Sequence, residues 1–139
     1  MQNVWAIFRN ADGSGFEKIY LTGFTPTPPR NEISKTALSA QNTIDWEYFK
    51  DPFELIECLR KENFTIYSVE LDEKSIDYKK MFYKTPENIC LVLGNEISWV
   101  NRKILDLSDE IVMIPMLWNK ESLNVSVAAW IVMYATVES

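Results

Sequence analysis

The sequence predicts an α/β fold with a doubly wound, mostly parallel sheet and helices on both of its faces. Apolar runs alternate along the chain with segments of helical spacing, an alternation that is typical of this class. Residues 89–93 (ICLVL) and 111–114 (IVMI) are apolar without alternation, as expected for parallel strands covered on both sides. The length of 139 residues fits one domain, and no internal repeat or linker interrupts it.

The amino-terminal part of the chain predicts a helix, a strand and a long connection. Residues 3–11 have apolar side chains at helical spacing, and residues 18–21 form a short expected strand. Residues 25–30 (TPTPPR) predict a loop, because proline supplies no backbone donor to a helix or a ladder. Residues 33–38 are expected to form one or two helical turns.

The clearest helix start lies at Asp51. Its carboxylate can cap the helix, Pro52 takes the first helical position, and Glu54 completes a pattern that resembles a capping box. We expect this helix to reach about Lys61, with a buried stripe formed by Phe53, Ile56 and Leu59.

The remaining expected elements complete the sheet and close the chain. Residues 64–71 are rich in β-forming side chains and predict a strand. Residues 89–93 predict a central parallel strand, and residues 111–114 predict another buried strand. Residues 123–135 predict the closing helix.

The amino-acid composition argues against several classes of function. The net charge of −6 argues mildly against nucleic-acid binding, although one local basic patch is enough to hold RNA. The absence of histidine argues against catalytic triads and zinc hydrolase sites. The apolar runs are far too short to span a membrane, and no secretion signal opens the chain. Cys58 and Cys90 lack CxxC spacing, so we expect reduced, mostly buried thiols in a cytoplasmic protein.

Three segments carry motifs in a distinctive order. Residues 3–23 read NVWAIFRNADGSGFEKIYLTG, residues 91–100 read LVLGNEISWV, and residues 114–130 read IPMLWNKESLNVSVAAW. Together they resemble the three motifs of the SpoU/TrmH family of RNA ribose 2′-O-methyltransferases, in the same order and at similar separations. SLNVSVA after IPM is highly specific, whereas LVLG alone would be weak. TPTPPRNEISKTAL also looks like the loop between the family's first two motifs.

The resemblance implies a fold, a cofactor and partners. Family members have the SPOUT architecture, in which the carboxyl-terminal segment threads through a loop to form a trefoil knot, one of the rarest topologies. The knotted loops bind S-adenosylmethionine without a metal, a homodimer completes the active site, and the substrate is tRNA or rRNA. The family usually has a strand before the first motif, so we expect the first parallel strand to be missing from residues 1–139.

The resemblance also assigns five residues to substrate and chemistry. Arg9 matches the motif arginine that would orient the 2′-hydroxyl and stabilise the developing alkoxide, since a guanidinium is a poor base. Asn3 would hold the ribose, and Glu96 would orient Arg9 or a loop. Ser122 and Asn124 would position the substrate and the knot loop. The structural alternatives are a surface arginine, two helix caps (Asn3 and Ser122) and a solvated carboxylate.

Five further residues match positions that line the family's cofactor pocket. They are Leu93, Gly94, Ile114, Met116 and Leu123. Backbone groups at strand ends would recognise the adenine, and apolar side chains would enclose it. For Ile114 and Leu123 the alternative is plain core packing.

Four tryptophans fall on family glycines: Trp5, Trp99, Trp118 and Trp130. The chain has 4 glycines, whereas average usage of about 7% would give roughly ten. We hypothesise that the native protein has glycine at these sites, encoded by a UGA codon that some bacteria read as glycine. Real indoles at positions 99 and 118 would crowd the cofactor loops, and Trp130 would wedge apart a close helix contact suggested by Ala128 and Ala129.

Two rival functions remain open on the sequence. The first is a catalytically inactive knot-fold dimer that binds RNA or a protein, which loss of cofactor binding would favour. The second is a flavodoxin-like nucleotide-binding module, which shares the α/β pattern but leaves SLNVSVA and Arg9 unexplained. A base-stacking role for the indoles is also conceivable, but it leaves their coincidence with glycine positions unexplained.

Overall fold

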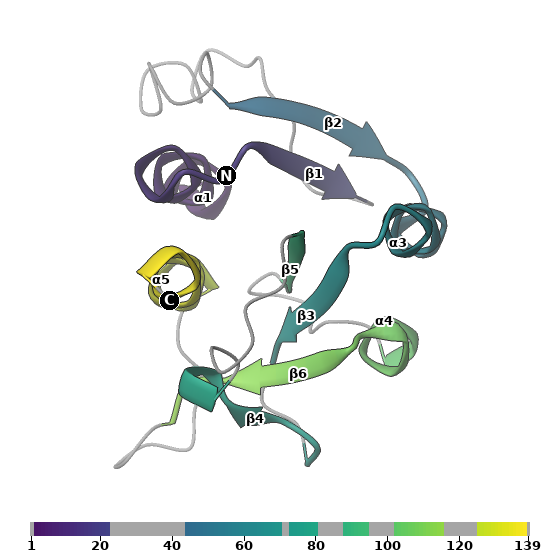
Figure 1. Cartoon of the computed structure of the whole chain (residues 1–139). Coiled ribbons are helices and arrows are strands. Elements are labelled where there is room, and N and C mark those ends of the chain that lie inside the picture. The colour runs from purple at the N-terminus through teal and green to yellow at the C-terminus, as the bar shows by residue number, and fades with distance from the viewer. Residues whose placement is uncertain are drawn as a thin grey trace. The chain divides into compact units, whose positions relative to one another are not determined.

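The computed structural model describes residues 2–22, 44–70, 73–80, 88–94, 102–115 and 125–138 (Figure 1). These residues belong to two compact units, Met1–Pro52 and Phe53–Ser139. The expected loop at 25–30 and the expected turns at 33–38 lie outside the described residues. No helix of the described ranges is long and apolar enough to cross a membrane.

The first unit is a helix followed by a two-stranded parallel ribbon. Helix α1 (Gln2–Ser14) and strand β1 (Lys18–Thr22) confirm the predicted elements, and β2 (Asp45–Phe49) pairs with β1 along its whole length. Phe8 and Ala11 on α1 and Ile19 and Leu21 on β1 are buried apolar side chains of this unit.

Polar groups end helix α1 and join the two strands of this unit. Gly15 has a φ of 83° and the Phe16 amide donates to the Ala11 carbonyl at 2.9 Å, which ends α1 with a left-handed residue that suits glycine. The ammonium of Lys18 lies 3.0 Å from a Glu47 carboxylate oxygen and so links β1 to β2. That hydrogen bond raises the pKa of Lys18.

The second unit is built on a four-stranded, fully parallel sheet with the strand order β4-β6-β3-β5. Helices α3 and α4 and helix α5 appear on opposite sides of this sheet (Figure 1). The elements in chain order are α3 (Pro52–Lys61), β3 (Thr65–Val69), β4 (Ile76–Asp77), β5 (Ile89–Leu93), α4 (Arg102–Leu107), β6 (Glu110–Met113) and α5 (Val125–Glu138).

Helix α3 confirms the prediction made from its capping residues. It begins at Pro52 and buries Leu55, Ile56 and Leu59, whereas Phe53 of the predicted stripe is only half-buried. The helix ends at Lys61, and Asn63, two residues later, takes the left-handed conformation that closes it, with a φ of 68°. The Phe64 amide donates to the Leu59 carbonyl at 3.0 Å and the Asn63 amide to the Arg60 carbonyl at 3.1 Å. These are the two hydrogen bonds of a Schellman motif.

The predicted central position of strand 89–93 was wrong for this sheet. Among the described strands, β5 lies at one end of the order and β3 is flanked on both sides. Ile66, Tyr67 and Ser68 of β3 are buried, whereas every residue of β5 is half-buried. An apolar run without alternation therefore indicates a strand with apolar side chains on both faces, but it does not indicate whether the strand is central or at the edge of the sheet.

Each face of the sheet has its own packing. Tyr67 and Val112 form one cluster with Val132 of α5. On the other face, the hydroxyl of Ser68 lies 2.5 Å from that of Ser108, which donates to the Ile104 carbonyl of α4 at 2.8 Å. Helices therefore cover both faces of a parallel sheet, as the sequence predicted.

Candidate functional site

The candidate cofactor residues lie where two parallel strands end. Leu93 is the last residue of β5, and Gly94 follows it. Ile114 directly follows β6. Val69 of β3 pairs with Leu93 on one side and with Val112 on the other, so β3 separates the two strand ends. Two strand spacings give a separation of about 10 Å, which a nucleoside-sized ligand can bridge.

Burial at this edge is intermediate. Leu93, Gly94 and Ile114 are all half-buried. The side chain of Ile114 packs against the cluster of Tyr67, Val112 and Val132, so its core-packing role is confirmed. In open parallel sheets, ligands bind outside the carboxyl ends of the strands, where loops supply backbone donors and acceptors. Half-buried apolar residues with a glycine at this edge fit the adenine of a cofactor.

Arg9 lies on the exposed side of α1. Its neighbours Phe8 and Ala11 are fully buried, so the helix has one face in the core of the first unit and Arg9 on another. An exposed guanidinium is accessible to a substrate phosphate, and its planar fork matches the phosphate oxygens. Arg9 belongs to the first unit and the three strand-end residues to the second.

The other predicted site residues are not placed by the structure. The backbone of Asn3 lies in α1, but its side chain is outside the described set. Glu96, Met116, Ser122, Leu123 and Asn124 lie outside the described residues. Their assignments remain predictions from the sequence.

The cysteines correct one expectation and refine another. Both are free thiols, but Cys58 is exposed on α3, so the prediction of burial was wrong for it. Burial raises the pKa of Cys90 to about 11. A thiol with this pKa stays protonated at neutral pH and is a poor nucleophile, which argues against covalent catalysis by Cys90.

Trp130 also departs from expectation. Its residue surface is 54% exposed and its ring makes an edge-to-face contact with Tyr134, with centroids 6.2 Å apart. Ala129 is fully buried, whereas the Trp130 side chain points largely to solvent, so the predicted wedging by the indole is not seen among the described residues. The side chain of Trp5, and all of Trp99 and Trp118, lie outside the described set.

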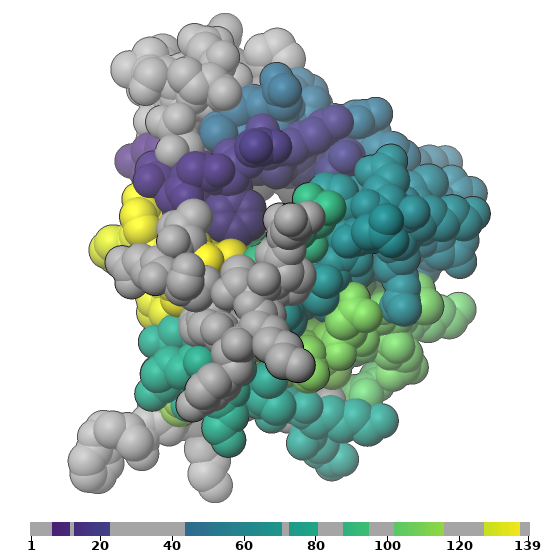
Figure 2. Space-filling view, viewed as in Figure 1, coloured from purple at the N-terminus to yellow at the C-terminus, as the bar shows by residue number. Residues whose placement is uncertain are grey.

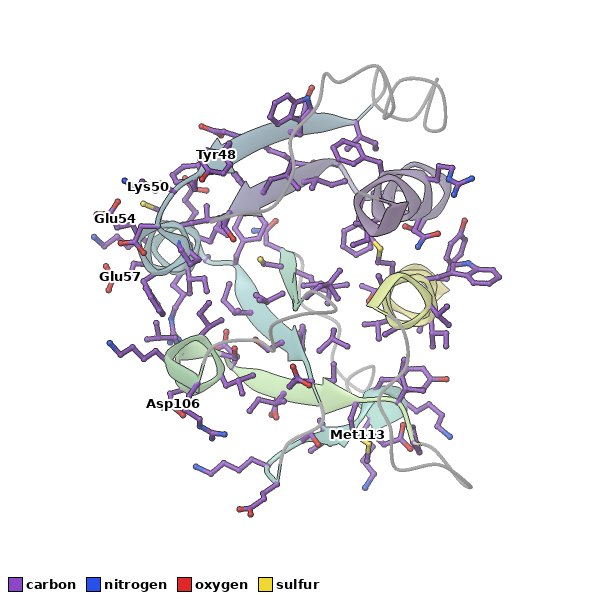
Figure 3. The ribbon with its side chains drawn as sticks, turned by 180° about the vertical axis from the view of Figure 1, so that it is seen from behind. Tyr48, Lys50, Glu54, Glu57, Asp106 and Met113 are labelled. Carbon is purple, nitrogen blue, oxygen red and sulfur yellow. The ribbon has the colours of Figure 1, made fainter. Side chains whose placement is uncertain are left out.

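One polar cluster at the carboxyl edge was missed from the sequence. Asp77 ends β4, pairs with Met113 of β6, and is followed by a helical turn with two lysines, Lys79 and Lys80. Figure 3 labels Met113 where β6 ends. The signal was the run DYKK, but a two-residue strand is too short for its apolar pattern to be recognised.

The fold and the strand-end site define a class: an α/β protein with parallel sheets and a candidate ligand site at the carboxyl ends of the strands. Residues 1–134 match the SpoU rRNA Methylase family, and the chain belongs to this family.

Known proteins agree with this membership. The tRNA (guanosine(18)-2'-O)-methyltransferase of Thermus thermophilus is 30% identical over 135 residues, 95% of this chain and 66% of that protein. The crystal structure of the A. aeolicus TrmH/SpoU tRNA modifying enzyme matches 98% of this chain and 68% of that one, with a TM-score of 0.84 and 26% identity.

A second solved structure supports the fold. The SpoU methyltransferase AviRb from Streptomyces viridochromogenes, in complex with the cofactor AdoMet, matches 98% of this chain and 55% of that one, with a TM-score of 0.86 at 19% identity. The curated relatives are longer: this chain spans 52% to 66% of their length.

Proposed function

We propose that the protein transfers a methyl group from S-adenosylmethionine to a ribose 2′-hydroxyl of tRNA or rRNA in the cytoplasm. The observation that carries the proposal is the family match over residues 1–134, which includes the strand ends expected to hold the cofactor. Relatives such as the T. thermophilus protein carry names that specify this reaction on tRNA. The absence of histidine leaves the chemistry to arginine, amide and carboxylate groups.

The cofactor would lie at the carboxyl edge of the second unit's sheet. Leu93 and Ile114 offer half-buried apolar surface, and Gly94 lets a ligand approach the backbone closely. Met116 and Leu123 complete the proposed pocket. When bound, S-adenosylmethionine supplies the electrophilic methyl group. The AdoMet complex of AviRb, a protein of similar fold, supports this choice of cofactor.

Arg9 would act on the nucleophile. Its exposed guanidinium is proposed to donate to the ribose oxygen and to stabilise the negative charge that develops there as the hydroxyl loses its proton to water or a substrate phosphate. Asn3 would hold the ribose and Glu96 would orient Arg9. Ser122 and Asn124 would fix the substrate and the loop before α5. Most of the rate would come from positioning.

The carboxyl-terminal trefoil knot and the homodimer belong to the same proposal. Helix α5 supports a second copy as partner, because its only charged residue is Glu138, at its end. A helix that is apolar on all sides is normally covered on all sides, yet Val127 is exposed, and so is position 130, where the native residue is hypothesised to be glycine.

The test compares Arg9→Ala with Arg102→Ala, a change at an exposed arginine on α4. Both are made in a protein with glycine at positions 5, 99, 118 and 130, as the codon hypothesis requires. Cofactor binding is measured by calorimetry, and methyl transfer by tritium incorporation into unmodified RNA with mapping of alkali-resistant 2′-O-methyl sites. Arg9→Ala is expected to bind cofactor normally and to lose about 10²–10³-fold in turnover, as for loss of an oxyanion donor.

The remaining outcomes separate the parts of the proposal. Full activity in Arg9→Ala would remove the role given to Arg9 and leave the reaction intact. A starting protein that binds no S-adenosylmethionine and methylates neither tRNA nor rRNA would contradict the function itself. Arg102→Ala is expected to be as active as the starting protein.

A further inference from the structure

The helical turn that follows β4 lies at the carboxyl edge of the sheet and is held there by polar and apolar contacts. Asp77 caps it: the Lys79 amide donates to one carboxylate oxygen at 3.0 Å, and the Lys79 ammonium lies 3.7 Å from the other. Tyr78 packs against the buried cluster that contains Val112 and Val132. Because both a cap and an apolar anchor fix this turn, its lysines project from a defined place.

The turn lies beside the strand end assigned to the cofactor. Ile76 pairs with Val112 and Asp77 with Met113, so the turn begins directly after the last residue pair of β4 and β6, and Tyr78 and Ile114 pack against the same buried cluster. One strand spacing of about 4.8 Å separates the two backbones. In Figures 1 and 2 the turn is the teal segment next to the end of β6, and it lies at the visible surface.

Its positive charge stands out in an acidic chain. The Lys79 side chain is 66% exposed despite its ion pair, and Lys80 is exposed. Within the described part of the chain, Lys80 has no carboxylate oxygen within 4.0 Å of its ammonium, whereas Arg60 and Arg102 each have one. The chain as a whole carries a net charge of −6.

The face formed by α3 and α4 carries charges of both signs, because Arg60, Lys61, Arg102 and Lys103 are exposed beside its carboxylates. Glu54 and Glu57 on α3 and Asp106 on α4 are exposed, and Figure 3 shows these labelled carboxylates on that side of the unit. Like charges repel a phosphate backbone. At the turn after β4, by contrast, two adjacent exposed lysines stand beside a single half-buried carboxylate, that of Asp77, and this local excess of positive charge favours approach of an anionic polymer there.

We propose that Lys79 and Lys80 bind the phosphate backbone of the RNA substrate next to the methylated nucleotide, with Lys80 as the main contact. The inference rests on the proposed function. A ribose whose 2′-hydroxyl reaches the methyl group must bring its flanking phosphates to the rim of the cofactor site. A lysine ammonium one strand away meets them as a point charge, which fixes the position of the RNA without selecting its sequence.

The experiment compares Lys80→Gln with Lys61→Gln in the protein used for the methyl-transfer assay. Lys61 is exposed at the end of α3, which leads into the start of β3, so this control removes the same charge at the opposite edge of the sheet. Unmodified bulk tRNA is the probe, and its Kd is measured against salt concentration. S-adenosylmethionine binding is measured in parallel, and circular dichroism checks the fold of each variant.

Lys80→Gln is expected to weaken RNA binding about three- to tenfold at low salt and to reduce the salt slope by about one, as for loss of one phosphate contact. The KM for RNA should rise while kcat and cofactor affinity stay unchanged. Lys61→Gln should behave as the starting protein does. This contrast distinguishes a local contact from a general loss of charge.

Three results would overturn the inference. If Lys80→Gln keeps the starting protein's Kd and salt slope while methylation proceeds, the lysine contact is wrong and the proposed function stands. Equal weakening by both variants would also overturn it, because the effect would then be one of net charge. A starting protein that neither binds nor methylates RNA would remove the proposed function and this inference with it.

Discussion

The two cysteines show how strongly a residue's properties depend on its place in the fold. Cys58 is exposed on α3, whereas burial in β5 raises the pKa of Cys90 from an ordinary value of 9.0 to about 11. Unfolding exposes the Cys90 thiol to water and returns its pKa to the ordinary value. Above pH 9 the unfolded chain therefore loses this proton before the folded chain does.

This difference predicts that the free energy of unfolding falls as pH rises from 9 to 11. The contribution of Cys90 is fully present below pH 9 and is lost as pH rises through 11. A shift of two units corresponds to about 2–3 kcal/mol. Urea unfolding at several pH values measures it, with Cys90→Val as the comparison. Tyr67, whose pKa is also raised by burial, is unchanged in both proteins. Identical pH profiles for the two proteins would contradict the role of Cys90.

At the scale of elements, the capping residues determine where helices end. Asn63 has a φ of 68°, a left-handed conformation that β-branched residues avoid. Asn63→Val should therefore lower the free energy of unfolding by about 1–2 kcal/mol, and Asn63→Gly should be neutral or slightly stabilising. Glu62→Val is the matched control, since Glu62 is exposed and is not in the left-handed region. Chemical denaturation measures all three, and equal losses at 62 and 63 would contradict the capping argument.

The elements also explain which parts of the fold were predictable. Helices α1, α3 and α5 and strands β1, β3, β5 and β6 were predicted because their apolar patterns or caps are local. Strand β2 (DWEYF) was missed because three of its five residues are exposed and its apolar pattern is incomplete, and because its partner β1 ends 23 residues before it. Strand β4 has two residues and α4 has six, too few for a periodic pattern.

The candidate site was predictable to a similar degree. Motif spacing placed Leu93, Gly94 and Ile114 correctly at strand ends, because an apolar run followed by glycine or proline predicts where a buried strand stops. The pairing of β4 with β6, which brings the turn with Lys79 and Lys80 to the edge where β6 ends, joins residues that are 36 apart in the chain and has no local signal. The exposure of Trp130 was missed because a glycine position in relatives suggested tight space there, whereas on this helix it is the neighbouring Ala129 that is fully buried.

At the scale of the whole molecule, the exposed apolar surface of α5 bears on whether the protein is a monomer or a dimer. Ala129, Val132 and Met133 are buried, whereas Val127 is 40% and Trp130 is 54% exposed. Tyr134, four residues after Trp130, contacts its ring, so these residues continue one apolar stripe along the helix. An exposed apolar stripe on an otherwise apolar helix favours self-association.

The proposed homodimer therefore predicts that the protein sediments as a dimer at micromolar concentration and that Val127→Glu shifts it toward monomer. A buried carboxylate without a partner at each copy's interface would cost several kcal/mol, enough to raise the dimer Kd by at least about 100-fold. Lys61→Glu, on exposed surface of α3, should leave the dimer intact. Sedimentation equilibrium over a wide concentration range measures both variants. A stable dimer typically covers about 800 Å² on each copy. If the unsubstituted protein sediments as a monomer, the homodimer is contradicted and another partner would have to cover α5.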